Sequence, residues 1–364
     1  MSKLKNLIAE LCPNGVEFKP LGEIAEMKRG TSITKKNSVN GVYPVISGGR
    51  EPAFYCNQYN REGETITVAG SGAGAGFVQF WNKPIFVCDA FSVKGTEKIL
   101  TKFIYYCLTN LQENIYATKK GGGVPHVHIS SIENFKIPIP PLAVQAEIVR
   151  ILDTFTELTA ELTAELTARK KQYEYYRDLL LTFEDVEYKT LGDIAEIGTG
   201  NSNTNEGFSQ GLYPFFVRSG TPLYKNKFEY DETAIITAGD GVGVGKVFHY
   251  IEGKYALHQR AYRIHIISHE VIPKYFYHYM RTNFLKYIEK NMYQGSVASI
   301  RRPMLNNFPI PLPPLAEQER IVKILDRFDK LCNDLSEGIP AEIALRKKQY
   351  EYYRDKLLTF EEAK

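Results

Sequence analysis

The sequence predicts an α+β fold class: two tandem globular domains joined by two long antiparallel coiled-coil helices, with pseudo-two-fold, circular symmetry. Three observations predict it. The chain has 364 residues, enough for two cores. It repeats itself along its length. Each repeat ends in a long segment whose apolar residues follow helical spacing. The composition, 43% hydrophobic and 24% charged with a mean hydropathy of -0.28, is that of a globular protein without a membrane-spanning apolar run.

The repeat extends over nearly the whole chain. FKPLGEIAEMKRG, from Phe18, matches YKTLGDIAEIGTG, from Tyr188. RKKQYEYYRDLLLTFE, from Arg169, agrees with RKKQYEYYRDKLLTFE, from Arg346, at 15 of 16 positions. The N-terminal segment resembles the end of the first repeat, so the chain begins partway through a repeat. Such a chain can close on itself with approximate two-fold symmetry.

The globular parts are predicted over residues 1–140 and 184–313. GETITVAG and DETAIITAG have the composition of short strands, and KFIYYCLTNLQENIY and KYFYHYMRTNFLKYIEK that of helices. Many short strands with one or two helices predict an α+β domain and not a doubly wound sheet. The first part includes a short amphipathic N-terminal helix that ends at Pro13 and Gly15.

The helical parts are predicted over residues 141–183 and 314–364, each after a double proline, which a first helical turn tolerates. Leu142 to Leu181 is long enough for a helix of about 60 Å. The second helical part contains Gly338 and Pro340, which should break or kink it. Two such apolar stripes bury each other most simply as an antiparallel pair.

The cysteine and charge patterns restrict the class of protein further. The five cysteines form no CxxC pair, which predicts reduced thiols in a cytoplasmic protein without a disulfide framework or a metal site. The start of the chain lacks the continuous apolar region of a signal peptide. The net charge of +3 is too small to identify a nucleic-acid binder, and it does not exclude one.

Repeated motifs carry a resemblance to a known family. They are PLGEIAE and TLGDIAE, the helix starts IPIPPLAVQAEIV and IPLPPLAEQERIV, and the duplicated RKKQYEYYRD. In this order and over essentially the whole chain, they resemble the specificity (S) subunit of type I restriction-modification systems.

The resemblance implies a scaffold with no catalysis of its own. Each globular part would be a target-recognition domain that reads one half of an interrupted site in double-stranded DNA. The paired helices would set the half-site spacing and dock two modification subunits. This chain would need no cofactor, because the modification subunits carry S-adenosylmethionine and methylate adenine at N6. Restriction, or motor, subunits would join for cleavage, and no membrane partner is implied.

The sequence motifs also indicate a protein without catalytic activity. An adenine methyltransferase needs an [DNS]PP[YFW] segment, and the only PP pairs are in IPPLA and LPPLA. The glycine runs GSGAGAG and GDGVGVG lead into strand-like segments and do not open a helix, and Asp240 and Val247 break a phosphate loop. They are either connections between strands or places where backbone approaches DNA phosphate. The alternative function is a coiled-coil interaction scaffold without DNA specificity.

Two sets of loop residues are candidate DNA contacts, with ordinary solvated charge as the alternative. Lysines position a DNA backbone, whereas Arg and Gln can recognise a base bidentately. CDAF, from Cys88, corresponds to HQRA, from His258, and this divergence predicts two different half-sites. The candidates are Arg29, Lys35, Lys36, Ser47, Gly49, Arg50, Ser71, His126 and His128 in the first domain, and Arg218, Ser219, Lys225, Gln259, Arg260, Arg301 and Arg302 in the second.

The near-identical helical segments are the candidate docking surface, because two identical partners are best held by two near-identical surfaces. Tyr173 and Tyr176 are predicted to lie in the core of the helix pair. The charged positions beside them are the predicted contacts: Arg169, Lys170, Lys171, Glu174 and Arg177, with Arg346, Lys347, Lys348, Glu351 and Arg354 in the second copy.

The TAEL units before the first copy are the predicted spacer. They comprise Thr159, Ala160, Glu161, Leu162, Thr163, Ala164, Glu165 and Leu166. Four helical residues add about 6 Å and turn the next segment by about 40° beyond one full turn. One base pair turns DNA by roughly 34°. One unit should therefore change the gap between half-sites by one base pair, or by two. The rival interpretation is a slippage-prone helical tract with no metric role.

Overall fold

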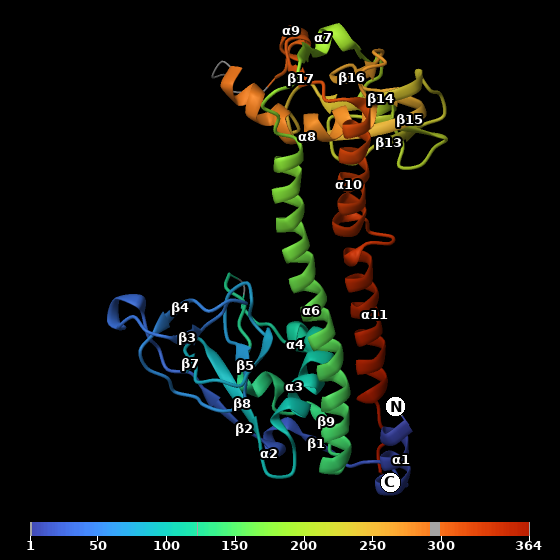
Figure 1. Cartoon of the computed structure of the whole chain (residues 1–364). Helices are drawn as coiled ribbons and strands as arrows, with labels where there is room; N and C mark the ends of the chain where they lie inside the picture. The colour runs from blue at the N-terminus through green and yellow to red at the C-terminus, as the bar shows by residue number, and fades with distance from the viewer. Residues whose placement is uncertain (1, 122, 292–298, 364) are drawn as a thin grey trace. The chain divides into compact units, whose positions relative to one another are not determined.

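The computed structural model describes residues 2–121, 123–291 and 299–363, and the chain divides into two compact units (Figure 1). Unit 1 comprises Met1–Thr163 and Ile343–Lys364, and unit 2 comprises Ala164–Glu342. The end of the chain therefore belongs to the same unit as its start. There, Val16 and Glu362 form a parallel β-bridge, as expected of a circularly arranged repeat.

Unit 1 is built on a four-stranded antiparallel sheet in the order β2-β8-β5-β6, with a three-stranded sheet in the order β4-β3-β7 and a pair β1-β9. The strands are β1 (Phe18–Pro20), β2 (Ala25–Arg29), β3 (Tyr43–Ile46), β4 (Phe54–Cys56), β5 (Thr65–Ala69), β6 (Val78–Trp81), β7 (Phe86–Val87), β8 (Ala90–Gly95) and β9 (Lys136–Pro138). The helices of the domain are α1 (Ser2–Leu11), α2 (Leu21–Ile24), η1 (Lys35–Asn37), α3 (Thr101–Asn110), α4 (Gln112–Ala117) and α5 (Ile129–Ile132).

Helix α3 covers one face of the four-stranded sheet and contacts β5, β6 and β8 (Figure 1). Ile66 and Val93 of the sheet share a fully buried cluster with Phe103 and Ile104 of the helix. The single helix predicted over KFIYYCLTNLQENIY is wrong in one respect. Leu111 has a bridge-region backbone, so the segment forms two helices, α3 and α4.

Unit 2 repeats this topology in one six-stranded sheet of order β11-β16-β14-β15-β12-β13, with a pair β10-β17. The strands are β10 (Tyr188–Thr190), β11 (Ala195–Thr199), β12 (Tyr213–Phe216), β13 (Leu223–Lys225), β14 (Tyr230–Ala238), β15 (Phe248–Leu257), β16 (Ala261–Ile266) and β17 (Pro309–Pro311). The helices are α7 (Leu191–Ile194), η2 (Thr204–Glu206), α8 (Pro273–Asn291), α9 (Arg302–Asn306) and α10 (Leu315–Asn333).

One proline accounts for the difference between the sheets. Strand β15 is continuous and joins all six strands, whereas its counterpart in unit 1 is divided into β6 and β7. Pro84 lies between these two short strands. Because proline has no N–H to donate to a ladder, it interrupts the strand at this point.

The long helices are as predicted. Helix α6 runs without a break over Leu142–Leu180, 39 residues, whereas the C-terminal segment divides into α10 and α11 (Ile339–Leu357). The break ends at the predicted Gly338, and the predicted Pro340 lies in the first turn of α11. In unit 1, Phe155 of α6 stacks on Tyr353 of α11, with ring centroids 5.3 Å apart. In unit 2, Tyr173 and Tyr176 each lie 6.1 Å from the ring of Phe328 in α10. No helix in the described part of the chain is long and apolar enough to span a membrane.

A buried glutamine fastens each globular domain to its long helix. Gln145 and Gln318 are fully buried. The side chain of Gln145 accepts a hydrogen bond from Leu100 N at 2.8 Å and donates to the carbonyls of Lys98 and Pro140 at 3.1 and 2.7 Å. The side chain of Gln318 makes the same three bonds in unit 2, with Ile272 N and the carbonyls of residues 270 and 313. The glutamine of the repeated PPLAxQ motif is therefore a structural clamp.

Candidate functional site

A cavity of about 470 Å³ lies at one end of the sheet in unit 1. The end of β2 contributes Arg29, the turn between β7 and β8 contributes Asp89, and the segment before α5 contributes His126 and His128. Arg29 Nη2 lies 3.1 Å from His128 Nδ1, and the two histidine rings stack with centroids 6.0 Å apart. The structure thus brings together three predicted contact residues and adds a carboxylate that sequence reasoning missed.

Gly70, which lines this cavity, is the first residue of the glycine run GSGAGAG, which connects β5 to β6 and does not open a helix. This geometry confirms that the run is a connection between strands and not a dinucleotide site. A Cβ on Gly74 would lie 2.4 Å from the carbonyl oxygen of Gly48, so only glycine permits this approach. Ser71, within the run, donates its hydroxyl hydrogen to Asp89 Oδ2.

The remaining candidates of the first domain lie outside this cavity. Lys35 and Lys36 are exposed on η1, and Ser47, Gly49 and Arg50 lie between β3 and β4. The Arg50 guanidinium is 4.9 Å from the centroid of the Phe77 ring, and its backbone carbonyl accepts a hydrogen bond from Gln79 at 2.6 Å.

Unit 2 carries a different set of side chains at the equivalent end of its sheet. Arg218 follows β12, Asp240 follows β14, and Arg260 precedes β16. Asp240 accepts hydrogen bonds from Arg218 Nη1 at 2.7 Å and from Arg260 Nη1 at 3.1 Å. Arg218 lines two adjoining cavities of about 500 and 450 Å³, the second of which includes Gln259 and Arg260.

The charge state of this second site follows from its contacts. Burial opposes ionisation of Asp240, but the hydrogen bonds and positive charges of Arg218 and Arg260 outweigh it and lower the pKa of the carboxyl group. Burial, followed by the positive charge of Arg218, lowers the pKa of His258. His258 Nδ1 accepts a hydrogen bond from Arg260 N at 2.9 Å. Near pH 7 the site therefore holds two guanidinium groups, one carboxylate and a neutral imidazole.

Other candidates of the second domain have partners of their own. Lys225 is paired with Glu206 at 2.9 Å, and its side chain is only 17% exposed, so most of its charge is already matched and covered. The Ser219 hydroxyl donates to the carbonyl of Thr221 at 2.7 Å. Arg301 and Arg302 are exposed at the start of α9.

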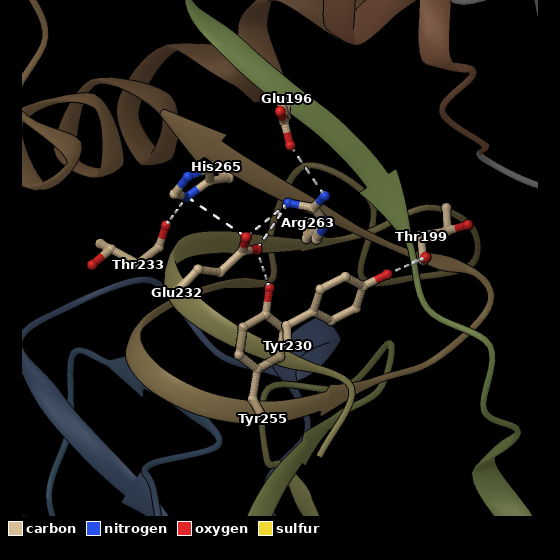
Figure 2. Close-up of polar contacts among 8 residues, drawn as sticks. All are labelled: Glu196, Thr199, Tyr230, Glu232, Thr233, Tyr255, Arg263 and His265. Carbon is tan, nitrogen blue, oxygen red and sulfur yellow. Dashed lines mark hydrogen bonds and ion pairs between the residues drawn. The ribbon is translucent and has the colours of Figure 1, made fainter. Parts of the chain in front are cut away.

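A polar network joins strands β11, β14, β15 and β16 of the sheet in unit 2 (Figure 2). Arg263 of β16 lies between Glu196 and Glu232, at 3.5 and 2.9 Å, with its guanidinium 4.7 Å from the centroid of the Tyr230 ring. Tyr230 Oη donates to the carbonyl of Thr199 at 2.9 Å. Because Thr199 is the last residue of β11, this bond anchors the loop that carries Asn203, the partner of Gln259.

The predicted docking residues have the same geometry in both units. Arg169 bonds the side chain of Gln172 at 3.1 Å, and Arg346 bonds that of Gln349 at 3.2 Å. Arg177 and Arg354 likewise each bond the following aspartate at 2.8 Å. Lys170, Lys171, Glu174, Lys347, Lys348 and Glu351 are all exposed. Of the two tyrosines predicted to be core, Tyr173 is 9% exposed, whereas Tyr176 remains 38% exposed at the edge of an apolar groove in unit 2.

The two domains share one fold, and each gathers hydrogen-bonding side chains at the same end of its sheet. Together with the repeated helical surface, this arrangement defines a bipartite recognition protein. Comparison with known proteins shows to which family of such proteins the chain belongs. The profile of the type I restriction modification DNA specificity domain matches residues 13–169 and again 183–345. The chain belongs to this family, with two DNA specificity domains.

Relatives of similar length support this family assignment. The chain is 36% identical to the Escherichia coli type I restriction enzyme EcoR124I/EcoR124II specificity subunit, over 99% of this chain and 98% of that protein. It is 33% identical to a putative type I restriction enzyme specificity subunit of Haemophilus influenzae, over 95% and 96% of the two chains. The crystal structure of the type I S subunit from M. genitalium has the same fold, with a TM-score of 0.71 at 18% identity, covering 94% of this chain and 96% of that one.

The residues that sequence reasoning missed are Asp89 and Asp240. Both lie in segments that the sequence marks, since Asp89 is part of the diverged segment CDAF and Asp240 interrupts a glycine run. Their partners are 18 and 20 to 22 residues away along the chain, so only the fold shows that each carboxylate organises a site.

Proposed function

We propose that this chain is a non-catalytic subunit whose two domains each read one half of an interrupted, asymmetric site in double-stranded DNA. The observation that carries the proposal is that cavities lie at equivalent positions of two repeated domains, one in unit 1 and two adjoining ones in unit 2, and are lined by different side chains. Two domains that catalysed the same reaction would need the same reactive groups in both sites. Two domains that recognise different half-sites need the same backbone fold with different hydrogen-bonding side chains.

The repeated helical surfaces are the proposed docking sites for two modification subunits. They support this role because arginine and glutamine side chains adopt the same contacts in both copies, as two identical partners require. The modification subunits are expected to carry S-adenosylmethionine and to methylate adenine, and restriction subunits would complete the complex. Replacing Lys171 or Lys348 by glutamate should each remove one modification subunit, a loss that the mass of the purified complex would report.

The TAEL segment is the proposed spacer. Helix α6 is continuous over Thr159 to Leu166, and the hydroxyls of Thr159 and Thr163 donate to the carbonyls four residues before them, at 2.8 and 2.7 Å. These local bonds satisfy the threonines within the helix itself. One unit can therefore be removed or added without leaving a polar group unpaired.

The test is co-expression of this chain with its modification subunit, followed by mapping of methylated adenines. Two different half-sites separated by a fixed gap are expected. Exchanging residues 21–135 for the same region of a relative should change the first half-site alone. A short uninterrupted palindrome would contradict the proposal. A missing footprint on DNA, even with the modification subunit present, would favour the alternative of an interaction scaffold without DNA specificity.

A further inference from the structure

Asp89 and Arg260 occupy the same position in the two domains. In unit 1, Gly70 N donates to the carbonyl of Asp89 at 3.0 Å. In unit 2, Gly239 N donates to the carbonyl of Arg260 at 2.9 Å. Each residue is followed by an alanine that starts the next strand and pairs with the end of the strand preceding the glycine. The same backbone framework therefore presents an acidic side chain in one domain and a basic one in the other.

The surroundings of Asp89 suit a hydrogen-bond acceptor. Its side chain is exposed and lines the cavity, and Ser71 holds Oδ2. Its Oδ1 has no hydrogen-bond partner among the residues that the structure describes. An ionised carboxylate accepts hydrogen bonds only, and it is repelled by phosphate, so it is not suited to a contact with the DNA backbone. In the major groove its partner is an exocyclic amino group, on cytosine N4 or adenine N6.

The surroundings of Arg260 suit a hydrogen-bond donor. Asp240 accepts one bond from Nη1 of Arg260 and one from Nη1 of Arg218. The carboxylate thereby holds two like charges beside one another and limits the rotation of both side chains. The side chain of Arg260 remains 62% exposed, so it is accessible to a ligand although Asp240 holds Nη1. A fork of N–H groups in a fixed orientation matches guanine O6 and N7.

We propose, on the basis of the DNA-reading function above, that these equivalent positions determine opposite base preferences in the two half-sites. Asp89 accepts a hydrogen bond from the amino group of a cytosine or an adenine in the half-site of the first domain. Arg260 donates to guanine in the half-site of the second domain. Asp240 is a positioning residue that orients Arg260 and Arg218.

The experiment combines protein variants with altered bases. The complex of this chain with its modification subunit is titrated with duplexes that carry its mapped site. In one series, each cytosine or adenine of the first half-site lacks its amino group. In another, each guanine of the second half-site is replaced by 7-deazaguanine. The variants are Asp89→Asn, Arg260→Gln and Asp240→Asn, and the charge-matched controls on exposed residues of the same domains are Glu64→Gln and Lys286→Gln.

One altered base in each half-site should weaken binding by the wild-type complex about 5- to 150-fold, the range for a base contact. In the Asp89→Asn or Arg260→Gln complex, the same altered base should cause little further loss of affinity, because the variant no longer makes the contact to that base. Asp240→Asn should lower discrimination at the guanine alone, while the thermal midpoint and the salt dependence stay unchanged. The controls should discriminate as the wild type does.

Three results would overturn the inference. Additive losses would show that the residue and the base do not touch. A loss of affinity for all sequences, with the slope of log K against log salt reduced by about 1 in Arg260→Gln, would mark a phosphate contact. Unchanged methylated sequences in all three variants would exclude base reading. The altered duplexes test the wild-type complex even where a variant fails to fold. In each of these cases the two mapped half-sites, and so the proposed function, would stand; their absence would remove both.

Discussion

Replacing either buried glutamine by leucine should destabilise its own unit strongly. Leucine has nearly the same size as glutamine, so Gln145→Leu removes three hydrogen bonds without leaving a large cavity. Leu100 N and the carbonyls of residues 98 and 140 then lose their partner. A buried backbone group without a partner costs about 1–3 kcal/mol. Two of the three hydrogen bonds are only partly buried, so the low end applies, and the free energy of unfolding of unit 1 should fall by about 3 kcal/mol.

The assay uses the single tryptophan, Trp81, which lies in β6 of unit 1. Urea unfolding followed by Trp81 fluorescence reports unit 1, and its midpoint should fall by about 1 M at the slope typical of a unit of this size. The thermal midpoint should fall by about 6–12 °C. Gln318→Leu should lower the stability of unit 2 by a similar amount, visible by circular dichroism. Gln58→Leu, at an exposed position, is the control and should change the stability by less than about 0.5 kcal/mol.

A loss below about 1 kcal/mol for Gln145→Leu would refute this reasoning. It would mean that water replaces the glutamine at all three backbone groups, and that the PPLAxQ glutamine does not clamp the domain.

Three further predictions follow from single features. Deleting Thr163 to Leu166 should shorten the gap between methylated half-sites by one base pair, or by two, and an unchanged gap in the methylome would support the tract with no metric role. Gly200→Ala should lower the free energy of unfolding by more than about 3 kcal/mol, because the new Cβ would lie 1.8 Å from Leu257 O. The thermal midpoint should fall accordingly, and an unchanged midpoint would contradict this. The Arg150 hydrogen bonds, against the opposing effect of burial, lower the pKa of Glu147 to about 2. Its contribution, about 1 kcal/mol given exposed partners, should be present above pH 4.5 and be lost as the pH falls towards 2; urea titrations of Glu147→Gln and wild type should therefore converge at low pH.

The elements set by local chemistry were predictable from the sequence. The stripe of α6 repeats every three to four residues, and the break between α10 and α11 ends at Gly338, one residue before α11 begins with Ile339 and Pro340. Thirty-one residues separate Leu315 from Arg346, but 27 separate Leu142 from Arg169. The segment between α10 and α11 falls within the longer interval, so the extra four residues accompany the break.

The candidate site was only partly predictable. The repeat offsets aligned CDAF with HQRA and so identified where the domains diverge, but the strand pairing matches Asp89 with Arg260 and not with Gln259. They did not show that Arg218 and Arg260, 42 residues apart, share one carboxylate. Nor did they show that Lys225 is enclosed by Glu206 and the Phe215 ring, since a basic residue in a loop has the same local signature whether it is paired or open to solvent.

The sequence by itself determined the duplication, the family, the long helices and the position of their break. These depend on periodicity, on proline and glycine, and on motif order, all of which are properties of neighbouring residues. Only the tertiary structure decided the strand order, the joining of six strands by β15, the roles of Gln145 and Gln318, and the opposite side chains of Asp89 and Arg260 in one frame. These depend on hydrogen bonds between residues distant in the chain, whose partners no local pattern specifies.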